Sequence, residues 1–335
     1  GRYDCRPLAI RASCQGRLGG HGHPSVECGA RRAVWGKPRP IAPRLQRKGA
    51  ILSVMSSARP PLVPPEQEMT WASLKNRLRD ERDWMFRGQQ RLSWRLESSL
   101  ERAVASADER AKAEETLRFL FIQAAANYLP SGQLPRQPLD WLATMQHHGT
   151  PTRLLDFTRS PYIAAYFAIE DASKDEPCAI WAISESWCRS KADEALRRAG
   201  LGSAGLPTFS WLYQAQDWQP VALVAPAGSM QMSTRQIAQQ ALFGVSGDLS
   251  LSFEENLRAM VPLDEDIGEH VKCYQISGDK RGEVLRDLRL MNISRASLYP
   301  GLDGFAQSLR YSLVDEDIQR WIVRCALRGK HDLSF

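Results

Sequence analysis

The sequence predicts an α+β fold with a mixed central sheet and flanking helices. Three observations support this prediction. Short segments show the alternation of a strand, longer segments show the apolar spacing of a helix, and the two kinds do not follow the regular rhythm of a doubly wound fold. With 335 residues, 43% of them hydrophobic, the chain is long enough for one domain of about 250 residues or for two smaller ones.

The first 54 residues differ sharply from the rest in charge. They hold 11 Lys and Arg residues against only Asp4 and Glu27, a local charge of +9, so the other 281 residues carry −3 of the total of +6. Because this segment has no apolar period, we expect residues 1–54 to be a disordered basic tail. The abrupt change at Met55 indicates an upstream extension with Met55 as the natural start. A nucleic-acid-binding arm and an Arg-rich transit peptide are the alternatives.

The remaining residues are predicted to form one domain. Residues 55–80 read as a linker and a short helix, residues 81–250 as the core, and residues 251–335 as its completion by helices and a strand. A first strand is expected from Trp84, and Gly88 is expected to end it. Side chains alternate along a strand, so Arg87 should face away from Phe86.

Further elements follow from the same periodicities. Helices are predicted at Thr70–Leu78, Glu114–Tyr128, Asp140–Gln146, Asp279–Leu290 with Asp279 as its cap, Leu302–Leu309 and Glu316–Leu327. Strands are predicted at 179–183, 221–224 and 271–276.

Polar residues crowd between Gln146 and Ser160, with two histidines, two arginines and an aspartate before an apolar segment. Burying such groups costs free energy unless they pair or bind a ligand. Ser160 and Pro161 then suit the N-cap and first position of a helix. The free N–H groups of a helix start attract anions, so a ligand site is predicted here.

The sequence shows no sign of a membrane span or of a metal site. No run of about 18 uncharged apolar residues exists, so no membrane span is expected. The body cysteines (Cys178, Cys188, Cys273 and Cys325) lack metal-ligand spacing, so we expect no metal site. A reduced, cytoplasmic protein is the simplest interpretation.

Three segments together resemble the FRG domain family. They are Phe86-Arg87-Gly88, the run from His147-His148-Gly149 through Asp156-x-Thr158 to Tyr166-Phe167-Ala168, and Arg235-x-x-x-Gln239-Gln240-x-x-Phe243. The resemblance spans Trp84 to Phe243, and Leu298 to Gly304 resembles the family's usual C-terminal end. Ala241 stands where the family tends to have Gly. The family implies no settled activity.

A second, weaker resemblance is to the arginine class of ADP-ribosyltransferases, whose fold is one form that the predicted sheet could take. In these enzymes a first-strand Arg binds the phosphates of NAD, hydroxyl residues shape the nicotinamide pocket, and a Glu orients the attack. The resemblance implies cofactor-binding roles for Arg87, Thr158 and Ser160, with NAD as substrate and no metal. Gly88, which permits close backbone approach, and Arg235, from the third FRG segment, are assigned to the same cofactor site. The third motif here offers Gln239 and Gln240 in place of Glu, so catalysis is expected from His148, Asp156 and Gln240.

Structural roles compete with these functional ones. Asp156 could pair with Arg153 or Arg159, or cap the next helix, instead of holding a histidine or a ribose hydroxyl. Arg235 and Gln240 could support a sheet.

Two function classes remain open. One is an NAD-consuming enzyme, an ADP-ribosyltransferase or NAD glycohydrolase of the kind found in toxins and phage-defence effectors, with an unidentified protein or nucleic-acid target. The other is a non-catalytic module that senses a nucleotide or nucleic acid, and a metal-free hydrolase comes a distant third.

Overall fold

A computed structural model describes residues 62–80, 83–130, 134–201, 207–214, 218–262 and 264–310, together with residues 320, 323 and 324. The predictions for the tail at 1–54 lie outside the described residues. So does most of the helix predicted at Glu316–Leu327, although residues 320, 323 and 324 are helical.

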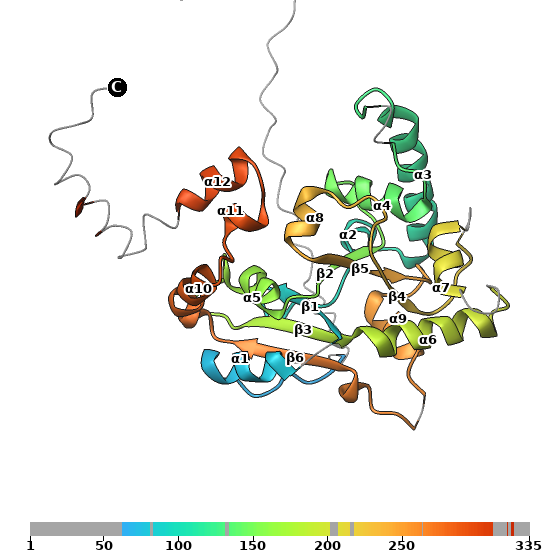
Figure 1. Ribbon diagram of the computed structural model, residues 1–335. Coiled ribbons are helices and arrows are strands. Elements are labelled where there is room, and N and C mark those ends of the chain that lie inside the picture. Colours follow the sequence, from blue (N-terminus) through green and yellow to red (C-terminus); the bar gives the residue numbers. More distant parts are fainter. Residues whose placement is uncertain are drawn as a thin grey trace, which may run out of the picture. The chain divides into compact units, whose positions relative to one another are not determined.

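The described residues form a six-stranded sheet in the order β4-β5-β2-β1-β3-β6, and every pairing in it is antiparallel. The strands are β1 (Trp84–Gln89), β2 (Leu154–Thr158), β3 (Cys178–Ser184), β4 (Val224–Ala227), β5 (Ala241–Ser246) and β6 (Val271–Ile276). Helices flank this sheet (Figure 1), so the predicted α+β class is confirmed. Since β6 pairs with β3, the segment after residue 250 completes the same sheet.

The longer helices are α1 (Trp71–Asp80), α3 (Ala107–Ala125), α4 (Pro138–His147), α5 (Pro161–Ile169), α6 (Glu185–Arg198) and α10 (Arg281–Leu290). Shorter helices are α2 (Ser99–Ala103), α7 (Pro207–Phe209), α8 (Thr234–Ala238), α9 (Phe253–Ala259), α11 (Arg295–Leu298) and α12 (Leu302–Ser308). Single turns are η2 (Ser210–Gln214), η3 (Ile267–Glu269) and η4 (Gly278–Lys280).

Alternation along β1 divides the core into two clusters. Phe86 packs with residues of α1, α5 and α10, whereas its neighbour Met85 packs with residues of α4, α6 and α9. Both side chains are fully buried. The prediction that consecutive residues of this strand face opposite sides is therefore confirmed, although the strand ends at Gln89 and not at Gly88.

The other strands were predicted unevenly. Those at 179–183 and 271–276 are confirmed as β3 and β6. The strand at 221–224 was placed too early, because β4 occupies Val224–Ala227 and includes Pro226, which an edge strand tolerates. No strand was predicted at the positions of β2 and β5.

The helix predictions agree with the structure better than the strand predictions do. Ser160 caps α5 by accepting a hydrogen bond from the Ile163 N–H, and Pro161 takes its first position. The proposed cap Asp279 is wrong, because η4 precedes α10 and Lys280 is its N-cap. No helix was predicted at the positions of α6 and α9.

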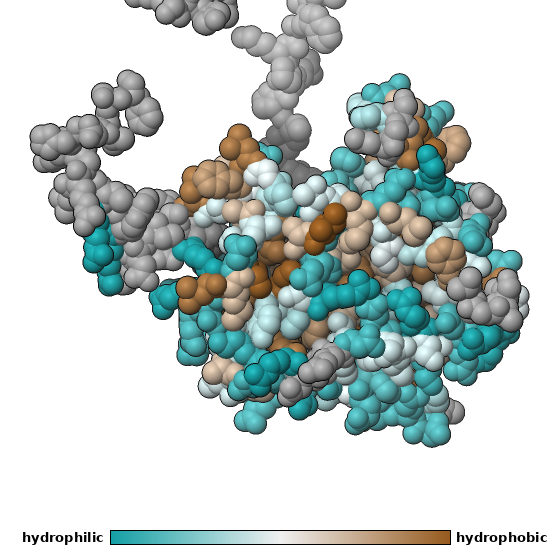
Figure 2. Space-filling model, in the orientation of Figure 1, coloured by the Kyte–Doolittle hydropathy of each residue, from teal (hydrophilic) through white to brown (hydrophobic). Residues whose placement is uncertain are grey.

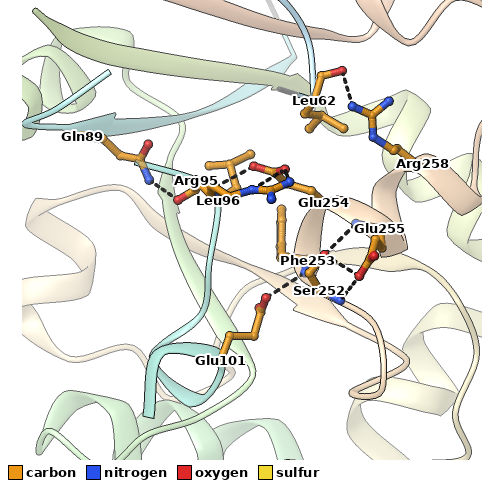
Figure 3. A network of polar contacts seen from close by, with 10 residues as sticks. All are labelled: Leu62, Gln89, Arg95, Leu96, Glu101, Ser252, Phe253, Glu254, Glu255 and Arg258. Atoms are coloured by element: carbon orange, nitrogen blue, oxygen red, sulfur yellow. Dashed lines mark hydrogen bonds and ion pairs between the residues drawn. The ribbon is translucent and has the colours of Figure 1, made fainter. Parts of the chain in front are cut away.

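Carboxylates tie α9 to the segment that joins β1 to α2 (Figure 3). Glu254 accepts hydrogen bonds from the Arg95 guanidinium and the Leu96 N–H, and Glu101 accepts from the Phe253 N–H. Glu101 also closes a capping box with Ser98. Together these bonds hold α2 against the start of α9.

Figure 2 shows a surface in which hydrophilic residues predominate, with apolar side chains gathered over α12, where Leu302 and Phe305 are exposed. Among the described residues, no helix has the length and apolar character needed to cross a membrane. The thiols of Cys178, Cys188 and Cys273 are free and buried, and burial raises the pKa of Cys178 to about 12.

Candidate functional site

Strands β1 and β2 share only one register pair, Phe86 with Thr158. Beyond that pair the Arg87 side chain bridges the two strands, because its Nη1 donates to the Asp156 carbonyl oxygen over 2.8 Å. Its Nε is buried and has no hydrogen-bond partner among the described residues. Burial lowers the pKa of Arg87, the nearby Asp156 carboxylate raises it, and the Arg102 charge lowers it again.

A cavity of about 280 Å³, here called the central cavity, lies beside the part of β1 and β2 that shares no ladder pairing. Residues of β1, β2, β5, α4, α5 and α8 line it together with Gln239 and Tyr299. They are Phe86, Arg87, Gly88, Ala143, Gln146, His147, Asp156, Phe157, Thr158, Phe167, Arg235, Gln236, Gln239, Ala241, Phe243 and Tyr299.

Five of the eight residues chosen from the sequence line this cavity although they are far apart in the chain. They are Arg87, Gly88, Asp156, Thr158 and Arg235. His148, Ser160 and Gln240 do not line it. The roles assigned to all eight remain predictions.

His147 lines the cavity in place of His148. Helix α4 runs one residue further than expected, so His147 lies four residues after Ala143 on the same helical face, and His148 becomes the C-cap. The two imidazole rings meet edge to face at 5.0 Å. The pKa of His147 is lowered by partial desolvation and by the charges of His148 and Arg235.

Gln239 likewise lines the cavity in place of the predicted Gln240. Arg235 and Gln239 lie four residues apart along α8 and its C-cap, and both line the cavity. Gln240 has a left-handed backbone with φ of 47°, and its side chain is exposed. Ser160 is absent from the lining because its hydroxyl caps α5.

Thr158 is buried, and its hydroxyl is engaged by the protein. It donates to the Gln239 carbonyl oxygen over 2.7 Å and accepts from the Ser160 N–H over 3.1 Å. This hydroxyl fixes the start of α5 relative to the end of α8.

Of the charged residues near Asp156 in the sequence, Arg153 and Arg159 form ion pairs with distant glutamates, and Asp156 itself lines the cavity. Arg153 forms a buried ion pair with Glu114 at 2.5 Å, and Arg159 pairs with Glu185 at 2.9 Å. The alternative pairings of Asp156 with these two arginines are therefore wrong. Instead, Asp156 Oδ1 accepts from Gln146 Nε2 over 2.7 Å.

Gln146 is held at its other end as well. Its Oε1 accepts from the Thr152 hydroxyl over 2.5 Å, which fixes the amide so that its NH₂ group faces Asp156. Asp156 is thus oriented in the cavity wall and is also exposed to solvent.

Tyr299 closes the cavity with arginines packed against its ring. The Arg235 guanidinium lies 4.5 Å and the Arg295 guanidinium 4.6 Å from the ring centroid. Arg295 is also bonded to Glu170 at 2.6 Å, whereas no described carboxylate pairs with Arg235. Arg235 therefore presents a cation to the cavity.

The cavity combines two arginines and aromatic rings with a single carboxylate, Asp156. Such a lining suits an anionic ligand that has a flat ring. Within the described parts of the chain, no group of three or more His, Cys, Asp or Glu side chains could hold a metal ion.

Gln146, His147, Gln239 and Tyr299 line the cavity but were not predicted as site residues. Each lies inside or beside a motif noted in the sequence, and His147 and Gln239 directly adjoin the predicted His148 and Gln240.

Residues 82–177 match the family model of the FRG domain. No curated protein and no solved structure matches the chain. The matched region includes Arg87, Gln146, His147, Asp156 and Thr158 and ends before β3, so the lining residues from α8, β5 and the Tyr299 segment come from outside it. The match shows that residues 82–177 of this chain are similar to the FRG domain.

Proposed function

We propose that the central cavity binds a phosphate-bearing nucleotide and that NAD is consumed there. The bond between the ribose and the nicotinamide of NAD breaks, nicotinamide leaves, and the ADP-ribosyl group passes to a nucleophile of a macromolecule or to water. The observation that supports nucleotide binding is the state of Arg87. Its buried Nε has no partner among the described residues. A buried donor left without a partner costs about 1–3 kcal/mol. A phosphate oxygen at this atom would remove that cost through a charge-assisted hydrogen bond.

The other lining residues have roles that fit this ligand. Arg235 supplies a second cation at the cavity, next to the ring of Tyr299. The rings of Tyr299 and Phe167 offer surfaces for a nucleobase or nicotinamide. Asp156 is the carboxylate of the lining, and in the proposed reaction it orients a ribose hydroxyl or the attacking nucleophile.

Incubation of the protein with NAD that carries a labelled adenylate tests turnover. Release of labelled ADP-ribose, or label bound to a macromolecule, is the expected result, and Asp156→Asn should abolish it. Asp156→Asn keeps the shape of the side chain and removes its charge. Unchanged NAD after prolonged incubation would contradict the catalytic part of the proposal.

Thermal melting with and without NAD tests binding separately, because a ligand that binds only the folded state raises the melting temperature. Wild type should show this rise and Arg87→Ala should lose it. The matched control is Met85→Ala, which truncates a fully buried residue of β1 that does not line the cavity. It should melt lower, by about 2–5 kcal/mol in stability, but keep its response to NAD.

A non-catalytic nucleotide sensor is the second candidate. Two observations favour it: Asp156 is already bonded to Gln146, and Gln240 does not line the cavity. A rise in melting temperature without any turnover of NAD would select this candidate.

A further inference from the structure

A smaller cavity of about 110 Å³, here called the side cavity, adjoins the central one. The two share Arg87, Gln146 and Asp156 in their linings. The side cavity adds Arg102 from α2 and Gly149 and Thr150 from the turn after α4. Arg87 therefore lines both cavities.

The lining of the side cavity includes two arginines, Arg87 and Arg102, and one carboxylate, Asp156. Arg102 is exposed, and its Nη1 donates to the Glu97 carbonyl oxygen over 2.6 Å. No described carboxylate pairs with it, and its charge is close enough to Arg87 to lower the pKa of that residue. Two like charges beside one cavity repel each other unless an anion lies between them.

The backbone that carries Arg102 is held in place. Its neighbour Glu101 closes the capping box of α2 with Ser98 and also accepts from the Phe253 N–H at the start of α9 (Figure 3). Arg102 thus projects from a fixed helix, so little backbone freedom is lost when a ligand binds.

The side cavity is the smaller of the two, at about 110 Å³ against about 280 Å³ for the central cavity. A single phosphate is smaller than a nucleobase, so we assign a phosphate to the side cavity.

We infer that the side cavity is a second phosphate subsite formed by Arg87 and Arg102. The ligand class is then a nucleoside diphosphate or a pyrophosphate-linked nucleotide, with one phosphate on each side of Arg87. This inference rests on the proposed nucleotide function of the central cavity.

Calorimetric titration of the full chain with AMP and with ADP tests the inference. Wild type should bind ADP about tenfold more tightly than AMP, since one charge-assisted contact is gained. Arg102→Gln should remove most of that difference and leave AMP affinity within about twofold of wild type. The matched control is Arg110→Gln, which removes another arginine that donates to a backbone carbonyl, that of Val104, and lines neither cavity. It should change neither affinity.

The outcomes separate this inference from the proposed function. If wild type binds AMP and ADP equally well, or if Arg102→Gln weakens both ligands to the same extent, the second subsite is refuted and the central site stands. If wild type binds neither ligand, the proposed function fails and the inference fails with it.

Discussion

Gly88→Ala is expected to destabilise the protein strongly, because α5 lies directly against the backbone of β1 at this residue. A Cβ added at Gly88 would lie 2.0 Å from the Ala164 carbonyl oxygen and 2.5 Å from the Ala168 nitrogen. An ordinary contact begins at 3.4 Å, so α5 would have to retreat by about 1.4 Å. Both obstacles are backbone atoms of one helix, so no side-chain rotation relieves the clash.

The cost follows from packing. Overpacking a core costs about 1–3 kcal/mol and sometimes more. A gap of about 0.5–1 Å already removes a quarter to a half of the dispersion energy of the atoms that face it. We therefore expect Gly88→Ala to lose about 3 kcal/mol or more, and to melt roughly 6–12 °C lower at 2–4 °C per kcal/mol.

Thermal melting of matched glycine variants measures this effect. Gly282→Ala is the control, because it lies in α10 with nothing within 4 Å of the added Cβ. Alanine favours a helix interior by about 0.5–1 kcal/mol over glycine, so this variant should melt slightly higher. A Gly88→Ala protein that melts within about 2 °C of wild type would refute the packing explanation.

Two further predictions concern the ion pair and the imidazole near the cavity. Glu114→Ala leaves the buried Arg153 without its carboxylate, so it should cost about 3–5 kcal/mol in urea unfolding, and a loss below about 1 kcal/mol would contradict this. The pKa of His147 is lowered by desolvation and by neighbouring positive charge, so an anion that neutralises the charge should raise this pKa and bind more tightly as the pH falls. Affinity for ADP measured from pH 8 to pH 5 should rise by about tenfold per unit of that pKa increase, and His147→Gln should flatten the profile.

The sequence predicted the strands that show a clear alternation or an apolar run better than those that show neither. The alternation around Phe86 and the apolar runs of β3 and β6 were clear. In β2, however, Asp156 and Thr158 interrupt the apolar pattern because they line the cavity. The same polarity that marked the site therefore hid the strand.

At two places the residue that lines the cavity is the direct neighbour of the one predicted: His147 in place of His148, and Gln239 in place of Gln240. His147 and Gln239 lie four residues after Ala143 and Arg235, so their place depends on where α4 and α8 end. Helix ends are the least certain part of a sequence-based prediction. The approach of Tyr299 to Arg235 depends on contacts between distant segments, and local patterns do not encode these.

The central claim is that Arg87 holds a nucleotide phosphate, and calorimetric titration of wild type and Arg87→Ala with ADP-ribose tests it most directly. A charge-assisted hydrogen bond contributes about 1.5–3 kcal/mol, so the variant should bind roughly ten- to a hundredfold more weakly. Its melting temperature without ligand should fall only slightly, since the variant loses the one hydrogen bond from Nη1 to the Asp156 carbonyl oxygen but also removes a buried Nε that has no described partner. Equal affinity in the two proteins, or an Arg87→Ala protein that melts far lower yet keeps its response to ADP-ribose, would show that Arg87 only bridges β1 and β2.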